Sequence, residues 1–188
     1  MHLTRWANLP GEKDTSQANK GMDLEKETIN ACEYYNNQRR ALIHKAPTPI
    51  HPVKVNYKTG KITLAFFESK STVDFTGNYK GRHIAFDTKE TKVDTRFDLS
   101  LVKKHQYEYL KDNFIDGGIS FLIVSFTTLG DIYLLPIELL DEYWRSLNGK
   151  NRKSIPIGEF TYEIENDGLI RIGFLKSVDQ YLEGELNG

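Results

Sequence analysis

Apolar and charged side chains alternate through residues 83–89, and this alternation constrains the fold of the chain more than any other feature. Successive side chains of an extended strand point to opposite faces, so Ile84 and Phe86 face one way while Asp87 and Lys89 face the other. One face is therefore expected to join a core and the other to carry charge. Asp87 and Lys89 lie roughly 6.5–7 Å apart along the backbone, so both can reach one phosphate group.

A second acidic residue, Asp74, lies one predicted strand earlier. Residues 78–81 predict a tight turn, and a hairpin centred on this turn places Asp74 directly opposite Asp87. Opposed residues have Cβ atoms about 4.5–5.5 Å apart, so the two carboxylates repel each other unless a cation lies between them. The spacing Asp-x(12)-Asp-x-Lys therefore predicts a metal-dependent nuclease site. Mg²⁺ would supply an attacking water, and Lys89 would stabilise the charge that grows on the phosphate.

The same residues also have a simpler interpretation. Charged residues make up 27% of the chain, so an Asp-x-Lys pair arises often, and most such pairs belong to a solvated strand face. The acid on the neighbouring strand favours the metal site, because two facing acids without a cation destabilise the sheet.

Length and composition predict one folded domain. The chain has 188 residues, 39% of them hydrophobic, which is enough for a sizeable core. No apolar stretch approaches the roughly 20 residues of a membrane span, and residues 1–21 lack the apolar core of a signal peptide. We therefore expect a cytoplasmic protein without a membrane partner. The single cysteine, Cys32, excludes an intramolecular disulfide and a cysteine-based zinc site.

Charge is distributed unevenly along the chain. Residues 1–106 hold 18 Lys/Arg against 12 Asp/Glu, a balance of +6, whereas residues 107–188 hold 7 against 14, a balance of −7. This asymmetry favours a basic surface around the predicted site, as phosphate recognition requires, although chance clustering would give the same counts.

The N-terminal part divides into a tail and a helix. Residues 1–20 are polar and charged, and we expect a flexible tail that either folds onto a phosphate backbone or has no role. Residues 21–186 are predicted to form a single nuclease domain. Helical spacing over residues 23–40 places Glu25 at the border of an apolar stripe. Glu25 either faces a cleft and assists metal binding, or stabilises the helix N-terminus through the dipole.

A protruding hairpin is predicted within residues 47–70. Two alternating segments, 53–57 and 61–67, flank the turn at residues 58–60, while the prolines at 47, 49 and 52 exclude a helix. Cations and aromatic rings together suit a nucleic acid, because rings stack on bases, although Phe66 and Phe67 would more commonly be core residues.

The remaining elements predict an α/β or α+β fold with a sheet flanked by helices. We expect a helix over residues 98–112, two central strands at 118–126 and 132–135, and a helix that begins at Pro136. Gln106 lies on the apolar stripe of the first of these helices. Its amide either makes a routine backbone hydrogen bond or presents its oxygen to the metal site.

Eight motifs spread over most of the chain are shared with one nuclease family: residues 21–26, 43–49, 71–75, 79–81, 89–92, 105–106, 133–136 and 152–155. On these motifs the chain resembles the RecU family of Holliday junction resolvases, which belong to the restriction-endonuclease-like superfamily. The resemblance implies a mixed central sheet flanked by helices, with residues 47–70 as a stalk directed towards the centre of a four-way junction.

The resemblance also implies roles for particular residues. Asp74 and Asp87 would bind Mg²⁺, Thr72 and Gln106 would contribute neutral oxygens, and Lys89 would stabilise the transition state. The family acts as homodimers on four-way junction DNA, and a bacterial recombinase is a further expected partner. The full set of predicted DNA-binding residues is Lys54, Lys58, Lys61, Phe66, Phe67, Lys80 and Arg82.

Two departures from the family pattern bear on catalysis. Val73 precedes the first acid where the superfamily often has proline, and Asp87 stands where the family usually has glutamate. The shorter side chain predicts either a shifted ion or a bridging water, and activity that is weaker or depends more on Mn²⁺. The leading prediction is a Mg²⁺-dependent resolvase. The alternatives are a nuclease of the same superfamily that cuts flaps or duplex DNA, and a protein that binds junctions or modulates a recombinase without cutting.

Overall fold

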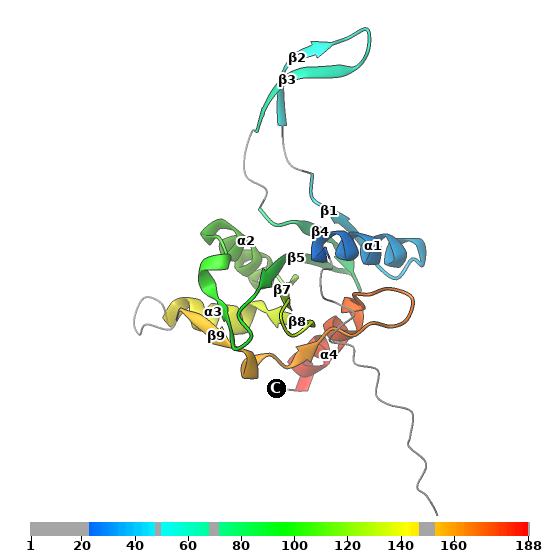
Figure 1. Cartoon of the computed structure of the whole chain (residues 1–188). Helices are drawn as coiled ribbons and strands as arrows, with labels where there is room; N and C mark the ends of the chain where they lie inside the picture. Colours follow the sequence, from blue (N-terminus) through cyan, green and yellow to red (C-terminus); the bar gives the residue numbers. More distant parts are fainter. Residues whose placement is uncertain (1–22, 48–49, 68–71, 147–152, 188) are drawn as a thin grey trace, which may run out of the picture.

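The fold is described by a computed structural model that covers residues 23–47, 50–67, 72–146 and 153–187 (Figure 1). Its elements follow the predicted order of helix, strands, helix, two strands and helix, and short strands and a final helix come after these. They are α1 (Leu24–Asn37), β1 (Leu42–Lys45), β2 (Ile50–Asn56), β3 (Lys61–Phe67), β4 (Phe75–Tyr79), β5 (Arg82–Thr91), β6 (Arg96–Asp98), η2 (Leu99–Leu101), α2 (Lys104–Ile115), β7 (Ile119–Phe126), β8 (Asp131–Pro136), α3 (Ile137–Ser146), β9 (Ser154–Pro156), η3 (Ile157–Glu159), β10 (Tyr162–Glu163) and α4 (Phe174–Asn187).

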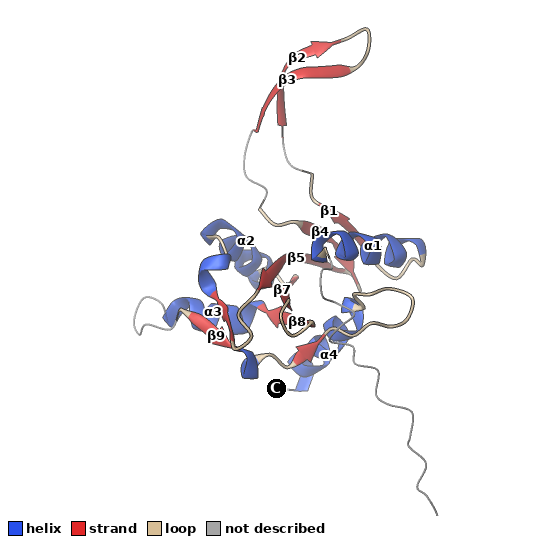
Figure 2. Ribbon diagram, viewed as in Figure 1, coloured by secondary structure: helices blue, strands red, loops and turns tan. Residues whose placement is uncertain are grey.

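A mixed six-stranded sheet in the order β1-β4-β5-β7-β8-β10 forms the centre of the body. β5 and β7 run parallel, and the other neighbours in the sheet run antiparallel. Helices flank this sheet on both faces (Figure 2), so the predicted fold class is confirmed. The β4–β5 hairpin has the predicted register, because Phe75 pairs with Phe86 and Tyr79 with Arg82. Its turn uses positive φ angles at Lys80 and Gly81, which suits a two-residue hairpin loop.

Each face of the sheet carries its own apolar core, and β5 separates them by the alternation of its side chains. Ile84 and Phe86 pack with α1 and α4, where Phe86 stacks between Phe75 and Phe121 at centroid distances of 4.9 and 4.7 Å. Ala85 packs on the other face, with apolar residues of α2 and α3. The second face of β5 is therefore not a solvated charged surface but lies beneath α2 and α3.

The predicted start of the helix over residues 98–112 is wrong. Leu99 to Leu101 form a 3₁₀ turn, and α2 begins at Lys104 and continues to Ile115. The backbone N–H of Leu99 donates to the carbonyl of Lys153, and Lys103 is extended, so a continuous α-helix cannot pass through this segment. The apolar periodicity that predicted the helix belongs partly to this turn, where Leu99 and Val102 are also buried.

Strands β2 and β3 form a separate two-stranded sheet that projects from the body (Figure 1). Every described side chain on it is exposed except Val55 and Ala65, which are half-buried. The ladder shifts register beside Pro52, as expected for a proline in a strand that no other element covers. The hairpin thus occupies residues 50–67 of the predicted stalk, and residues 48–49 and 68–70 lie outside the described residues.

No helix in the described part of the chain is long and apolar enough to cross a membrane. The predicted N-terminal tail, residues 1–20, falls outside that part.

Candidate active site

Asp87 is the central residue of the candidate site, and it is completely buried. It lies on β5 opposite Leu122 of the parallel strand β7. Both carboxylate oxygens are engaged: Oδ1 accepts a hydrogen bond from Lys89 Nζ at 2.9 Å, and Oδ2 accepts one from Gln106 Nε2. A carboxylate in such surroundings is costly unless a cation or several donors compensate its charge.

Asp74 lies one residue before β4, close to Asp87 across the hairpin. The β4–β5 ladder begins at the next pair, so Asp74 occupies the predicted position opposite Asp87 although it is not itself in the strand. Burial raises the pKa of Asp87 to about 6, the hydrogen bond and charge of Lys89 oppose this rise, and the nearby Asp74 carboxylate adds to it. The two acids therefore repel each other, as the sequence predicted.

Lys89 is mostly buried, with a side chain that is 14% exposed, and its ammonium forms an ion pair with Asp87. It shares the α2-facing side of β5 with Asp87, because the two residues are two positions apart on one strand. The structure thus brings Asp74, Asp87 and Lys89 together as the spacing predicted.

Gln106, in the first turn of α2, completes this cluster. Its Nε2 donates to Asp87, while its Oε1 accepts the backbone N–H of Lys103 at 3.2 Å and so caps the helix. The side chain therefore makes the routine backbone hydrogen bond and also contacts the acid. For its oxygen to bind a metal, the amide would have to turn and release Lys103, so that role stays a prediction.

Glu25 lies in the first turn of α1, at the edge of the site. It does not reach the two aspartates. Its carboxylate accepts a hydrogen bond from Lys45, the last residue of β1, and both side chains are nearly half exposed. Glu25 and Lys89 line the same pocket of about 380 Å³, together with Asp23, Thr88 and Glu90. Lys45 was not among the site residues predicted from the sequence. Its only signal was its position between a short apolar run and the proline-rich segment.

Thr72 is exposed and lies in a bend two residues before Asp74. The alternation that would place Thr72 and Asp74 on one face does not apply, because β4 begins only at Phe75. A contribution of Thr72 to the metal site stays a prediction.

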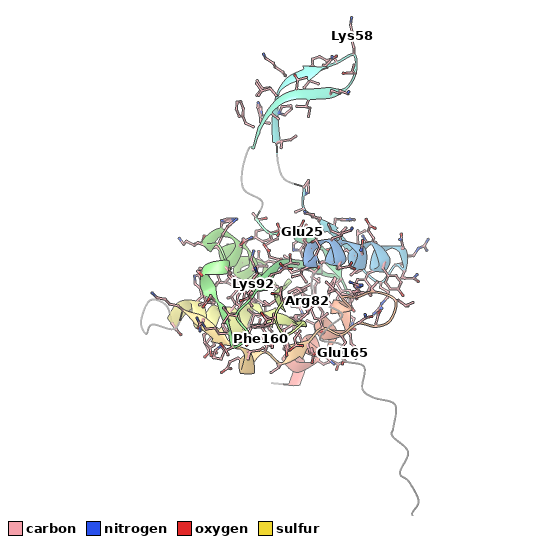
Figure 3. All side chains as sticks on the ribbon, viewed as in Figure 1. Glu25, Lys58, Arg82, Lys92, Phe160 and Glu165 are labelled. Carbon is pink, nitrogen blue, oxygen red and sulfur yellow. The ribbon has the colours of Figure 1, made fainter. Side chains whose placement is uncertain are left out.

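The predicted DNA-binding residues fall into two groups. Lys54, Lys58, Lys61 and Phe66 are exposed on the β2–β3 hairpin, and Lys58 lies at its far end (Figure 3). Phe66 is 62% exposed, so its alternative assignment to a core is wrong. The side chain of Phe67 lies outside the described residues.

Lys80 and Arg82 form the second group, and both are engaged by the body. Lys80 forms an ion pair with Asp179 at 2.7 Å, and Arg82 donates to the carbonyls of Gly117 and Gly118 at 2.8 and 3.0 Å. They lie at the opposite end of β5 from Lys89, roughly 23 Å away along the strand. DNA contacts by this pair would therefore be remote from the acids.

Sequence reasoning also missed Tyr57 at the tip of the hairpin. This ring is 92% exposed, and the turn that holds it is ordered by Asn56, whose side chain accepts from the backbone N–H groups of Lys58 and Thr59. An aromatic residue directly before a Lys-Thr-Gly turn was the available signal.

The donor set at the site fits Mg²⁺ with few protein ligands. Within the described residues no group of three or more His, Cys, Asp or Glu side chains is arranged to hold a metal. Mg²⁺ is commonly bound by one or two carboxylates, with water and substrate phosphates completing its octahedron. Asp74 and Asp87 would be that pair, and a cation between them would relieve their mutual repulsion.

The chain is similar to known proteins over most of its length. The family model described as recombination protein U (RecU) matches residues 19–180. The Holliday junction resolvase RecU of Pediococcus pentosaceus is 41% identical over 170 residues, which cover 87% of this chain and 85% of that protein. The protein of the same name from Staphylococcus aureus is 37% identical over 172 residues, which cover 88% and 83%. A solved structure of the Holliday junction resolvase Hjc from Archaeoglobus fulgidus aligns with 85% of this chain and 99% of its own, with 8% identity and a TM-score of 0.46, a level that supports no conclusion.

Proposed function

This chain belongs to the RecU family, and we propose on that premise that it is a metal-dependent endonuclease that resolves Holliday junctions by paired nicks. The observation that carries the proposal is the cluster in which Asp74, Asp87 and Lys89 meet, just before β4, where the chain returns from the hairpin. An exposed Asp-x-Lys pair would not have both carboxylate oxygens engaged in a buried site.

The metal ligands in this proposal are Asp74 and Asp87, with Thr72 and Gln106 as neutral contributors. When bound, Mg²⁺ would acidify a water for attack on phosphorus and neutralise charge on the phosphate, and Mn²⁺ would substitute for it. Lys89 orients the Asp87 carboxylate for this role. Gln106 holds Asp87 through its Nε2, and a contribution of its oxygen to the ion would require the amide to turn and exchange that hydrogen bond for the metal.

Lys89 and Glu25 act beside the ion. Lys89 lines the pocket, and its ammonium, oriented by Asp87, would donate to a phosphate oxygen as negative charge develops there. Glu25 orients Lys45 through their ion pair, so we assign it an indirect effect on the site rather than direct metal ligation.

The hairpin is the proposed DNA-binding element. Lys54, Lys58 and Lys61 would contact phosphates, while Tyr57 and Phe66 offer exposed rings on which unpaired bases can stack. At the open branch point of a four-way junction, the last base pair of each arm has one face without a stacked neighbour, and an aromatic ring can cover that face, whereas a continuous duplex offers no such face.

Two nicks on two strands require two sites, so we propose a symmetric homodimer. A bacterial recombinase is a further proposed partner, since junctions arise from its activity.

The test is cleavage of matched junction, flap and duplex substrates in Mg²⁺ and in Mn²⁺. The native chain should cut the junction preferentially, and both Asp74→Asn and Lys89→Ala should abolish cutting while leaving junction binding within about threefold, because most of the affinity comes from phosphate contacts elsewhere. Preferential flap or duplex cutting would indicate the other nuclease activity. Binding without cutting in either metal would indicate the non-catalytic role.

A further inference from the structure

The hairpin is connected to the body at a single place, which we call the hairpin root. Lys45 pairs with Phe75 as the last pair of the β1–β4 ladder. One more hydrogen bond extends this ladder, from the backbone N–H of Ala46 to the carbonyl of Asp74 at 2.7 Å. The root consists of Lys45, Ala46, Asp74 and Phe75, and the chain leaves it towards β2 and returns to it from β3.

Both strands of the root carry a group of the active site. Asp74 is the acid that faces Asp87. Lys45, on the other strand, binds Glu25, and the pKa of Lys45 is raised by this hydrogen bond and by the charges of Glu25 and Asp74. A displacement of the root would therefore move one proposed metal ligand and one ion pair at the pocket together.

Within the described residues, β2 and β3 pack chiefly against each other. Their described side chains are exposed or half-buried, and no helix of the body covers them (Figure 1). A seven-residue strand is roughly 23 Å long, so DNA bound along the hairpin can contact it well away from the root. Along the chain, the hairpin is joined to the body next to Ala46 on one side and Asp74 on the other.

We propose that the Ala46–Asp74 hydrogen bond couples DNA binding on the hairpin to the placement of Asp74, and so makes the backbone amide of Ala46 a determinant of substrate selectivity. The inference rests on the proposed function. DNA that engages the hairpin favours the root geometry in which Asp74 faces Asp87 at metal-binding distance. DNA that contacts only the body does not change the equilibrium between this root geometry and others.

Replacement of the donor tests this coupling. Ala46→Pro removes the N–H, and the preceding Lys45 is already in the extended conformation that proline requires. Ala46→Ser is the matched control because it keeps the N–H. Single-turnover cleavage in Mg²⁺ should fall about tenfold or more on a junction for Ala46→Pro, while nicking of a duplex with the same arm sequence stays within about twofold of native.

Two results would overturn the coupling. An equal fall on both substrates would mean that Ala46 only supports the site, and an unchanged junction rate would mean that the hydrogen bond transmits nothing. A native chain that cuts no junction in Mg²⁺ or Mn²⁺ would refute the proposed function instead, independently of Ala46.

A second measurement avoids the question of whether the proline variant folds. Hydrogen exchange of the native chain in EDTA, with junction bound but uncut, should show slower exchange at the Ala46 amide than the free protein does. A duplex of equal length should leave that amide unchanged. Equal exchange in all three states would contradict the proposal.

Discussion

Replacing Asp87 by asparagine should make the metal-free protein more stable relative to the native chain as the pH rises from about 4 to about 7.5, while it abolishes cleavage. The pKa of Asp87 rises from 3.8 to about 6 on folding, chiefly through burial and with a contribution from Asp74. A shift of about two units corresponds to about 3 kcal/mol at 1.36 kcal/mol per unit, the order of magnitude by which the ionised carboxylate destabilises the fold.

The sign of the pH dependence follows from the direction of the shift. Because the pKa of Asp87 is higher in the folded state, the folded protein binds more protons than the unfolded chain between about pH 4 and pH 6. The contribution of Asp87 to stability is therefore most favourable below about pH 4 and is lost as the pH rises through about 6.

Urea unfolding in EDTA measures this effect. The free energy of unfolding of Asp87→Asn minus that of the native chain should grow by about 2–3 kcal/mol between pH 4 and pH 7.5. Any difference between asparagine and protonated aspartate that does not depend on pH cancels when the two pH values are compared. Trp144, which stacks on Tyr107 at 4.5 Å, provides a fluorescence signal.

Two controls separate this effect from general changes in charge. Asp74→Asn should reduce the pH dependence of the native chain, since it removes a charge that raises the pKa of Asp87. Millimolar Mg²⁺ at neutral pH should stabilise the native chain more than Asp87→Asn. A difference between Asp87→Asn and the native chain that is the same at both pH values, or that decreases with rising pH, would refute the reasoning.

Three further predictions concern other parts of the molecule. Asp141 is buried but accepts hydrogen bonds from three side chains, which outweigh the effect of burial and hold its pKa below the ordinary range. Asp141→Asn should therefore cost about 1–3 kcal/mol at neutral pH and less below about pH 4, measured by urea unfolding. Gly77→Ala should cost about 3 kcal/mol in thermal unfolding, because a Cβ there would lie 2.6 Å from Cα of Ile43, whereas Gly158→Ala, with no atom within 4 Å, should be nearly neutral. Tyr57→Ala should weaken junction binding by about 1–3 kcal/mol in gel-shift titrations and Tyr57→Phe should not, if the ring stacks on a base.

Local patterns in the sequence were sufficient for the parts of the fold that depend on neighbouring residues. The alternation over residues 83–89 and the turn at 78–81 predicted the β4–β5 register, and with it the approach of Asp74 to Asp87. The resemblance to a known family, rather than any spacing, directed attention to Gln106. The helix start near residue 98 was wrong because apolar periodicity cannot distinguish a 3₁₀ turn from the α-helix that follows it.

The electrostatics of the site depended on residues far apart in the sequence. α2 covers the charged face of β5, so the face that the simpler interpretation treated as solvated instead holds a buried carboxylate with a raised pKa. The sequence was compatible with two roles for Glu25. The structure distinguishes them, because it shows that Glu25 pairs with Lys45, 20 residues away in the chain.

By itself the sequence determined which side chains share a face of each strand, because alternation with period 2 is a property of the extended backbone. Only the tertiary structure decided how deeply Asp87 is buried and that the hairpin joins the body at Asp74. Burial and long-range hydrogen bonds depend on how distant segments pack, and no local pattern encodes that packing.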